Sequence, residues 1–394
     1  MMAQESRWIP LILLLSASIV GPLLAVRLRL PTAVVLMLIG MALGPAGIGI
    51  LQDSPNISFL SEFGFLVLLF MAGMEIDFDA IRAAGRKALW VPLLVVAGIF
   101  SCATIGAKLL GLNGIGILVV AAMAVGMPLA VLKETGQDRA PLGRHVMLTG
   151  SLGEFFCILG ITALELTSSG PMGFHTLIHI LKISALFVLF VLILRWVRAL
   201  VWWHPELLRR LIGRHDVAEL GVRVGLAVML LFVFLSALAG VEPILGAFIG
   251  GALLGFVLRD KHTLESKIGA LGNGLFIPIF FIVVGVRFDA RALDLQSVQS
   301  ALVIAGVTGL AKILPSLVFA RKGTSLRERL AAGFLLCAPL TLVVAIAAIG
   351  RNLQMINGQT QACFVLVGIL ISVLFPILFK LLVRSRDPIS HEIH

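Results

Sequence analysis

Apolar runs of about 20 residues recur along the whole chain, and this pattern constrains the fold more than any other feature. An α-helix of that length is what crosses roughly 30 Å of hydrocarbon. Of the 394 residues, 59% are hydrophobic and only 13% are charged. Backbone groups inside a bilayer must be hydrogen-bonded within the protein, which restricts such runs to helices. The pattern therefore predicts an all-α polytopic membrane protein.

Thirteen transmembrane helices are expected, in a single transmembrane unit over residues 1–385 that is followed by a short cytoplasmic tail over 386–394. The longest connection has about 20 residues, which is too short for a separate soluble domain. The expected spans are 8–26, 33–51, 58–74, 88–110, 114–132, 146–167, 174–197, 219–239, 243–258, 270–286, 299–320, 330–350 and 361–382.

The positive charge follows the membrane. The net charge is +10, and of the 31 Lys and Arg residues 24 lie in alternate loops or after the last span, five lie on the opposite side and two lie within spans. Because basic residues concentrate on the cytoplasmic side, the N-terminus is expected outside and the C-terminus in the cytoplasm. The partner indicated by this distribution is the lipid bilayer, and no nucleic acid is expected.

Three segments repeat in the same order at an offset of about 212 residues. "FLVLLFMAGMEID" (65–77) matches "IPIFFIVVGVRFD" (277–289), "PTAVVLMLIGMALG" (31–44) matches "PILGAFIGGALLG" (243–255), and "MPLAVL" (127–132) matches "APLTLV" (338–343). The pattern predicts repeats over about 8–167 and 219–382, joined by a linker helix at 174–197. The offset moves each helix seven positions along, and because seven is odd the two repeats are inverted in the membrane.

Two prolines occupy matching positions within spans of the two repeats. Pro128, which follows Gly126, aligns with Pro339. A proline ring removes a backbone donor and clashes with the preceding turn, which frees carbonyl groups. An ordinary proline kink is the alternative, but symmetric positions favour two broken, crossing helices that enclose a site near the membrane midplane.

Two ionisable residues lie deep within expected spans, namely Glu154 in span six and Lys312 in span eleven. Ionisable groups at this depth are costly and mark ion or proton pathways. Structural alternatives for Glu154 are a permanently protonated acid and a static ion pair with Lys312. Lys312 is either a fixed cation that balances the broken helices or a carrier of transported charge. Glu75 and Asp77 lie near a span end and are candidates for the lining of an entrance.

The remaining reactive residues indicate neither an enzyme nor a cofactor. All four cysteines fall within spans and are expected to be small core residues. No nucleophile, base and oxyanion set can be assembled from the buried polar residues. A carboxylate that holds either a proton or a small cation would couple the two by competition, and oxygen ligands suit a hard cation.

From about residue 8 to 385 the chain resembles the cation:proton antiporter superfamily, which includes bacterial sodium/proton exchangers and the membrane part of glutathione-gated potassium efflux antiporters. The resemblance is carried by "GPLLAVRLRLPTAVVLMLIGMALGPAGIG", "GFLVLLFMAGMEID", "PILGAFIGGALLG", "FIPIFFIVVGVRFD", Ala311-Lys312 and "APLTLVVAIAAIG". It implies the sodium/proton antiporter fold, a homodimer in the bacterial inner membrane, and a core domain that moves like an elevator.

The resemblance also implies roles for individual residues. Glu154 would hold the cation or the proton, Lys312 would be the core lysine, and Pro128 and Pro339 would mark the breaks. Many electrogenic members carry two adjacent aspartates, whereas Gly153 occupies the first of these positions here. A single carboxylate resembles the electroneutral exchangers and implies one proton per monovalent cation.

Three further residues are expected around the ion. Relatives often have hydroxyl residues before the first proline, where this chain has "VGMPLAVL" with Met127, and "APLT" replaces a more charged pattern in the second break. Ser151 and Thr341 are the candidates to supply oxygen atoms in their place. The function expected is Na⁺/H⁺ exchange, with K⁺/H⁺ exchange as the alternative. A coupled symporter for a small solute and a non-transporting membrane sensor are the other classes left open.

Overall fold

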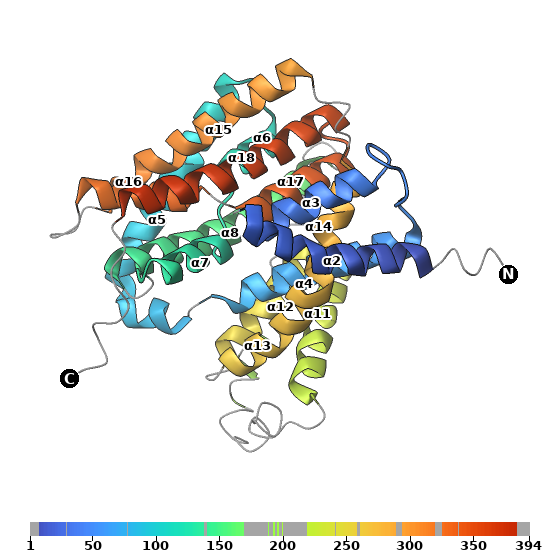
Figure 1. Cartoon of the computed structure of the whole chain (residues 1–394). Coiled ribbons are helices and arrows are strands. Elements are labelled where there is room, and N and C mark those ends of the chain that lie inside the picture. The colour runs from blue at the N-terminus through green and yellow to red at the C-terminus, as the bar shows by residue number, and fades with distance from the viewer. Residues whose placement is uncertain are drawn as a thin grey trace. The chain divides into compact units, whose positions relative to one another are not determined.

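The computed structural model describes residues 8–28, 30–76, 78–137, 140–168, 219–240, 242–257, 261–288, 294–319, 325–337 and 339–383, together with six isolated positions between 188 and 199. The expected linker helix at 174–197 therefore lies almost entirely outside the described residues. Every regular element within these ranges is helical (Figure 1).

The chain packs into two compact units, each assembled from two separate stretches of sequence. The first unit is Met1–Ile76 with Glu165–Phe288, and the second is Asp77–Leu164 with Asp289–His394. Each unit therefore takes about half of its helices from each sequence repeat. The helices of the first unit are α2 (Trp8–Leu28), α3 (Thr32–Leu43), α4 (Pro55–Met74), α11 (Leu220–Ala239), α12 (Pro243–Val257), α13 (Lys261–Leu271), the π-helix η1 (Gly272–Phe276) and α14 (Ile277–Val286).

The second unit contains the interrupted helices. Its elements are α5 (Phe78–Leu109), α6 (Gly114–Ala121), α7 (Gly126–Glu134), most of α8 (Pro141–Ser168), α15 (Leu295–Ser316), α16 (Leu326–Leu335), α17 (Leu340–Asn352) and α18 (Gly358–Leu382). A buried apolar cluster joins α5, α7, α8, α16 and α18.

Eight helices among the described residues are long and apolar enough to cross a membrane, or nine if α16 and α17 together count as one bent span. Three shorter apolar helical segments correspond to three further expected spans, namely Thr32–Leu43, Gly114–Leu129 and Pro243–Val257. Each expected span except the seventh therefore has a helical counterpart.

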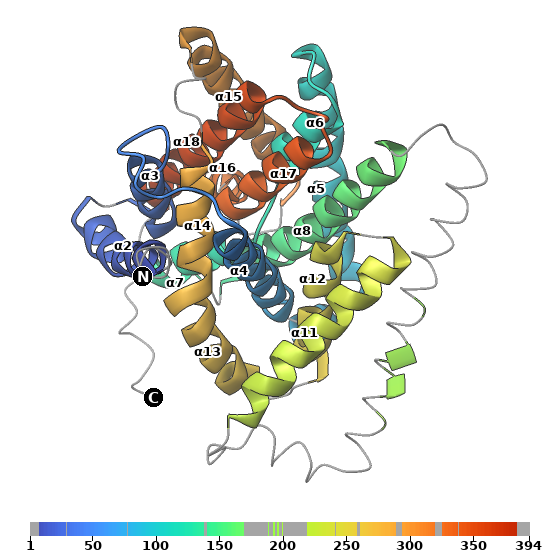
Figure 2. The ribbon, with the colours of Figure 1, turned by 90° about the vertical axis from the view of Figure 1, so that its right-hand side faces the viewer.

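Glycines bring two helix pairs of the first unit into backbone contact. A Cβ atom on Gly40 of α3 would overlap the carbonyl oxygen of Ile282 on α14. A Cβ atom on Gly251 of α12 would overlap the carbonyl oxygen of Phe70 on α4 in the same way. Figures 1 and 2 show α3 beside α14 and α4 beside α12.

The two glycine contacts are copies of one another in the repeats. Gly40 and Gly251 are 211 residues apart, and Phe70 and Ile282 are 212 residues apart. The contact is also reciprocal, because Gly73 of α4 meets the Phe248 carbonyl. The repeat offset found in the sequence is thus reproduced as the same packing contact made twice.

Helix α3 is shorter than expected. The sequence predicts a span over 33–51, but the helix ends at Leu43 and Gly44 is extended, with φ −77° and ψ −176°. Gly44 precedes Pro45, and the residue before a proline is disfavoured in the α region. The chain then turns back on itself, with Gly49 at φ +74° and the Leu51 N–H donating to the Leu43 carbonyl.

Candidate functional site

The first interruption separates α6 from α7 and consists of residues 122–125. Ala122, which ends α6, has φ −50° and ψ 130°, which is not helical. Pro128 lies in the first turn of α7, where its missing N–H requires no partner. In a continuous helix its ring would clash with the carbonyl of Ala124, four residues earlier. The proline thus accounts for an interruption that lies one turn before it.

The second interruption separates α16 from α17 and ends at Pro339, which caps α17 with φ −95° and ψ 59°. The residue four positions before Pro339 is Leu335, the last residue of α16. The two helices are bent by 42° at this point. Each interruption therefore lies within the two turns that precede its proline, and Gly126 is the first residue of the helix that follows the first gap.

Lys312 reaches the first interruption from α15. Its side chain is fully buried, and its Nζ atom donates a hydrogen bond of 2.5 Å to the Ala122 carbonyl. Ala122 caps the C-terminal end of α6, where unpaired carbonyls create a partial negative charge. The buried amino group of Lys312 is therefore placed at the helix end that favours a cation.

Glu154 reaches the same interruption from α8. It is 3% exposed, and its Oε2 atom accepts a hydrogen bond of 3.3 Å from the Val125 N–H. Val125 immediately precedes α7, whose N-terminal end carries a partial positive charge. The four-residue gap thus presents its negative end to Lys312 and its positive end to Glu154.

The other expected residues are distributed over several elements. Ser151 is buried one turn before Glu154 on α8, while Met127 and Thr341 are half-buried second residues of α7 and α17. Glu75 ends α4 in the first unit and is half-buried. Asp77 lies outside the described residues. Of the expected site residues, Glu154 and Lys312 are the two whose side chains bond the backbone of the first interruption.

Several residues at the interruptions were not predicted from the sequence. Met123, inside the first gap, is fully buried, and its side chain packs against Gly153 of α8. Cys337, inside the second gap, donates from Sγ to the Gly333 carbonyl at 3.1 Å and lies 3.9 Å from the Thr308 carbonyl. The proximity of Cys337 to Pro339 is the only sequence signal that marks it. All four cysteines are free thiols; Cys157, Cys337 and Cys363 are buried, as expected for core residues, whereas Cys102 is half-buried.

Thr308 adds an unused hydroxyl to the second unit. It is fully buried one helical turn before Lys312 on α15, and its Oγ1 atom has no hydrogen-bond partner among the described residues. A buried hydroxyl without a partner costs about 1–3 kcal/mol, so its presence beside a buried lysine is compatible with a polar path. The sequence gives no indication of it, because a threonine in an apolar helix is common.

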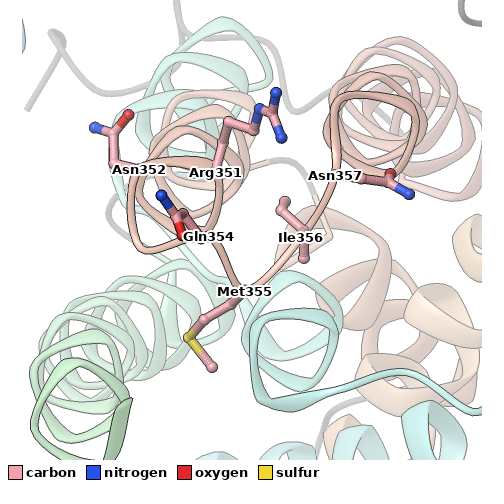
Figure 3. A pocket seen from close by; sticks show the side chains of 6 residues that line it. All are labelled: Arg351, Asn352, Gln354, Met355, Ile356 and Asn357. Atoms are coloured by element: carbon pink, nitrogen blue, oxygen red, sulfur yellow. The ribbon is translucent and has the colours of Figure 1, made fainter. Parts of the chain in front are cut away.

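Asn113 ties the start of α6 to the turn that follows α17. Its Oδ1 atom caps α6 by accepting from the Gly116 N–H, and its Nδ2 atom donates 2.8 Å to the Met355 carbonyl after α17. A hollow at this turn is lined by Arg351, Asn352, Gln354, Met355, Ile356 and Asn357 (Figure 3). None of the expected ion-site residues lines this hollow.

The carboxyl group of Glu154 can chemically bind a proton or supply oxygen ligands to a small cation. A carboxylate supplies hard oxygen ligands, and the freed backbone groups of the gap lie beside it. Both ionisable side chains are anchored on backbone atoms of one short segment, so a change in the charge of either acts directly on that segment.

Comparison with known proteins identifies relatives over almost the whole chain. The family model described as "Sodium/hydrogen exchanger, transmembrane" matches residues 14–384. YjbQ of Bacillus subtilis is 24% identical over 96% of this chain, which spans 63% of the length of that relative. A Na(+)/H(+) antiporter of Enterococcus hirae is 24% identical, and the match covers 94% of this chain and 96% of the length of that antiporter.

A solved structure confirms the fold. The sodium proton antiporter MjNhaP1 from Methanocaldococcus jannaschii superposes with a TM-score of 0.65 at 16% sequence identity, over 98% of this chain and 100% of its own. The expected all-helical antiporter fold and the expected superfamily are therefore both confirmed. Together with the apolar helices, the match identifies an integral membrane protein.

Proposed function

The chain belongs to the sodium/hydrogen exchanger family, and from this premise we propose that it is a secondary-active antiporter that exchanges Na⁺ for H⁺. Glu154 binds either the cation or the proton, and never both. Lys312 holds the C-terminal end of α6 in place through the Ala122 carbonyl. No resident cofactor takes part.

The observation that carries the proposal is the placement of Glu154 at the positive end of the first interruption. The Val125 N–H and the α7 dipole stabilise a carboxylate, whereas burial of the side chain disfavours a charge. A group held between these opposing influences can release its proton when a cation arrives. Competition for one carboxylate then couples the two ions.

Alternating access is proposed to be of the elevator type, with the second unit carrying the ion site. The first unit, in which glycines bring helix backbones into contact, is proposed as the rigid scaffold. Two copies of the protein are proposed to form a homodimer through this unit. The Lys and Arg distribution supports an orientation in the bacterial inner membrane with the N-terminus outside and the C-terminus in the cytoplasm.

The test is proton flux in sealed proteoliposomes that contain a pH-sensitive dye. Addition of Na⁺ or Li⁺ to the wild-type protein is expected to change the internal pH. Glu154→Gln is expected to abolish this response, because an amide cannot exchange a proton for a cation. Glu62→Gln, which neutralises an exposed carboxylate of α4, is the matched control and should retain the response.

Each outcome has a defined meaning. A response to K⁺ and not to Na⁺ would show that the protein exchanges K⁺, and not Na⁺, for H⁺. Full exchange by Glu154→Gln would remove this residue from the mechanism. Silence of the wild-type protein with every cation, in vesicles where a known ionophore responds, would refute the antiporter and leave solute symport or sensing.

A further inference from the structure

Met123 fills the space beside Gly153. A Cβ atom built on Gly153 would lie 2.7 Å from the Met123 Sδ atom and would overlap its terminal methyl group. Met123 is fully buried, so its side chain cannot withdraw into solvent. Any side chain at position 153 therefore competes with Met123 for the same volume.

Met123 belongs to the short segment that both ionisable side chains bond. Met123 follows Ala122, whose carbonyl binds Lys312, and lies two residues before Val125, whose N–H binds Glu154. Gly153 is the direct neighbour of Glu154 on α8. Met123 thus lies, in sequence, between the two residues whose backbone atoms bond the ionisable side chains, and its own side chain packs against the residue next to Glu154.

We propose that the Met123–Gly153 contact sets the room available to the cation beside Glu154 and makes Met123 a determinant of cation size selectivity. The inference rests on the proposed function, because it concerns the cation that Glu154 binds. The thioether sulfur of methionine is only a weak hydrogen-bond acceptor. Met123 would therefore limit the volume of the site without binding the cation, whose oxygen ligands come from other residues.

The contact predicts opposite effects for two single substitutions. Met123→Ala removes most of the wall and should favour the larger K⁺ over Na⁺. Gly153→Ala pushes the Met123 side chain out of its present position, and the displaced group should narrow the site and disfavour K⁺. In the double variant, the new methyl group occupies part of the vacated volume, so its selectivity should return towards the wild-type value.

The experiment measures the K⁺/Na⁺ ratio of apparent affinity in two ways. One is cation-driven pH change in proteoliposomes, and the other is the rise in Tm that each cation produces in the purified full-length protein. We expect the ratio to change by roughly ten-fold in opposite directions for the two single variants, the scale on which small changes in pocket volume alter discrimination.

Two controls separate selectivity from loss of stability. Met123→Leu preserves the volume and should keep the wild-type ratio. Met229→Ala truncates an equally buried methionine in the first unit and should lower Tm without a change in the ratio.

Failure of this inference differs from failure of the proposed function. If cations raise the Tm of the wild-type protein but drive no pH change, the antiporter is refuted. The K⁺/Na⁺ ratio measured by Tm then still tests the role of Met123. An unchanged ratio in Met123→Ala, or a double variant whose ratio stays at the extreme of either single variant, would overturn the role of Met123. Absence of both a cation-driven pH change and a cation-dependent Tm shift in the wild-type protein would overturn both.

Discussion

Two buried ionisable residues at this site each have a backbone partner whose partial charge is opposite to that of their ionised form. Lys312 bonds the terminal carbonyl of α6, and Glu154 bonds an N–H at the start of α7. An uninterrupted helix would use these groups internally and would offer neither partner. The gap therefore provides a backbone hydrogen-bond partner for each ionisable side chain. Both side chains contact the same four-residue segment.

A second charged contact, in the first unit, is predicted to respond to pH. Asp53 accepts hydrogen bonds from Arg287 at 2.8 Å and from Ser58 at 2.7 Å. Partial burial raises the pKa of Asp53, but these hydrogen bonds and the Arg287 charge outweigh it and hold the pKa below its ordinary value of 3.8. The stabilisation is therefore present above about pH 4 and is lost as the pH falls through the lowered pKa.

The corresponding test compares the wild-type protein with Asp53→Asn. Both side chains of the Asp53–Arg287 pair are about 40% exposed, so we expect the variant to lose about 0.5–1 kcal/mol at neutral pH. The difference in Tm, measured from pH 3 to 8, should be constant down to about pH 5 and should shrink below pH 4. A difference that persists unchanged at pH 3 would show that the carboxylate charge is not responsible.

At the scale of elements, small residues determine which helices approach each other. The α3–α14 and α4–α12 pairs touch through their backbones because Gly40, Gly73 and Gly251 lack a Cβ atom. Helix association in a bilayer depends on such close packing, since the lipid tails are as apolar as the side chains. The glycines that mark the sequence repeat are thus the residues that build its contacts.

Gly251→Ala is predicted to destabilise the first unit. The added methyl group would overlap the Phe70 carbonyl, which belongs to a helix backbone and can move only if α4 moves. Overpacking of this kind costs about 1–3 kcal/mol, and a lower Tm in detergent is the expected result. Gly274→Ala is the matched control, because a Cβ atom there has no neighbour within 4 Å. Equal Tm values for the two variants would contradict the tight contact.

At the scale of the whole molecule, the sequence predicted the class of fold but not the details of the interruptions. Apolar run length and the repeat offset predicted the helices of the described residues, although α3 ends earlier than expected. The depth of Glu154 and Lys312 within their spans singled out both as candidates. Proline identity placed the first gap only to within one turn, since the ring acts on a carbonyl four residues earlier. The Met123–Gly153 contact was inaccessible, because it depends on how α8 packs against a non-helical segment.

Electroneutral exchange is the prediction that concerns the complete transport cycle. If Glu154 carries one proton in one direction and one monovalent cation in the other, a full cycle moves no net charge. A voltage-sensitive dye should therefore remain silent during Na⁺-driven exchange, and a lipophilic cation that dissipates membrane potential should leave the initial rate unchanged. Vesicles with an imposed potential verify that the dye responds.

A voltage signal that grows with turnover would contradict one-for-one exchange and direct attention to Lys312. This lysine is fully buried, and if it released its proton during the cycle, it would add a charge that Glu154 alone does not account for. Lys312→Met should then eliminate the signal while cation-driven proton movement persists. If the wild-type protein is silent and Lys312→Met still exchanges ions at a reduced Tm, the lysine is a fixed cation whose role is to anchor the end of α6.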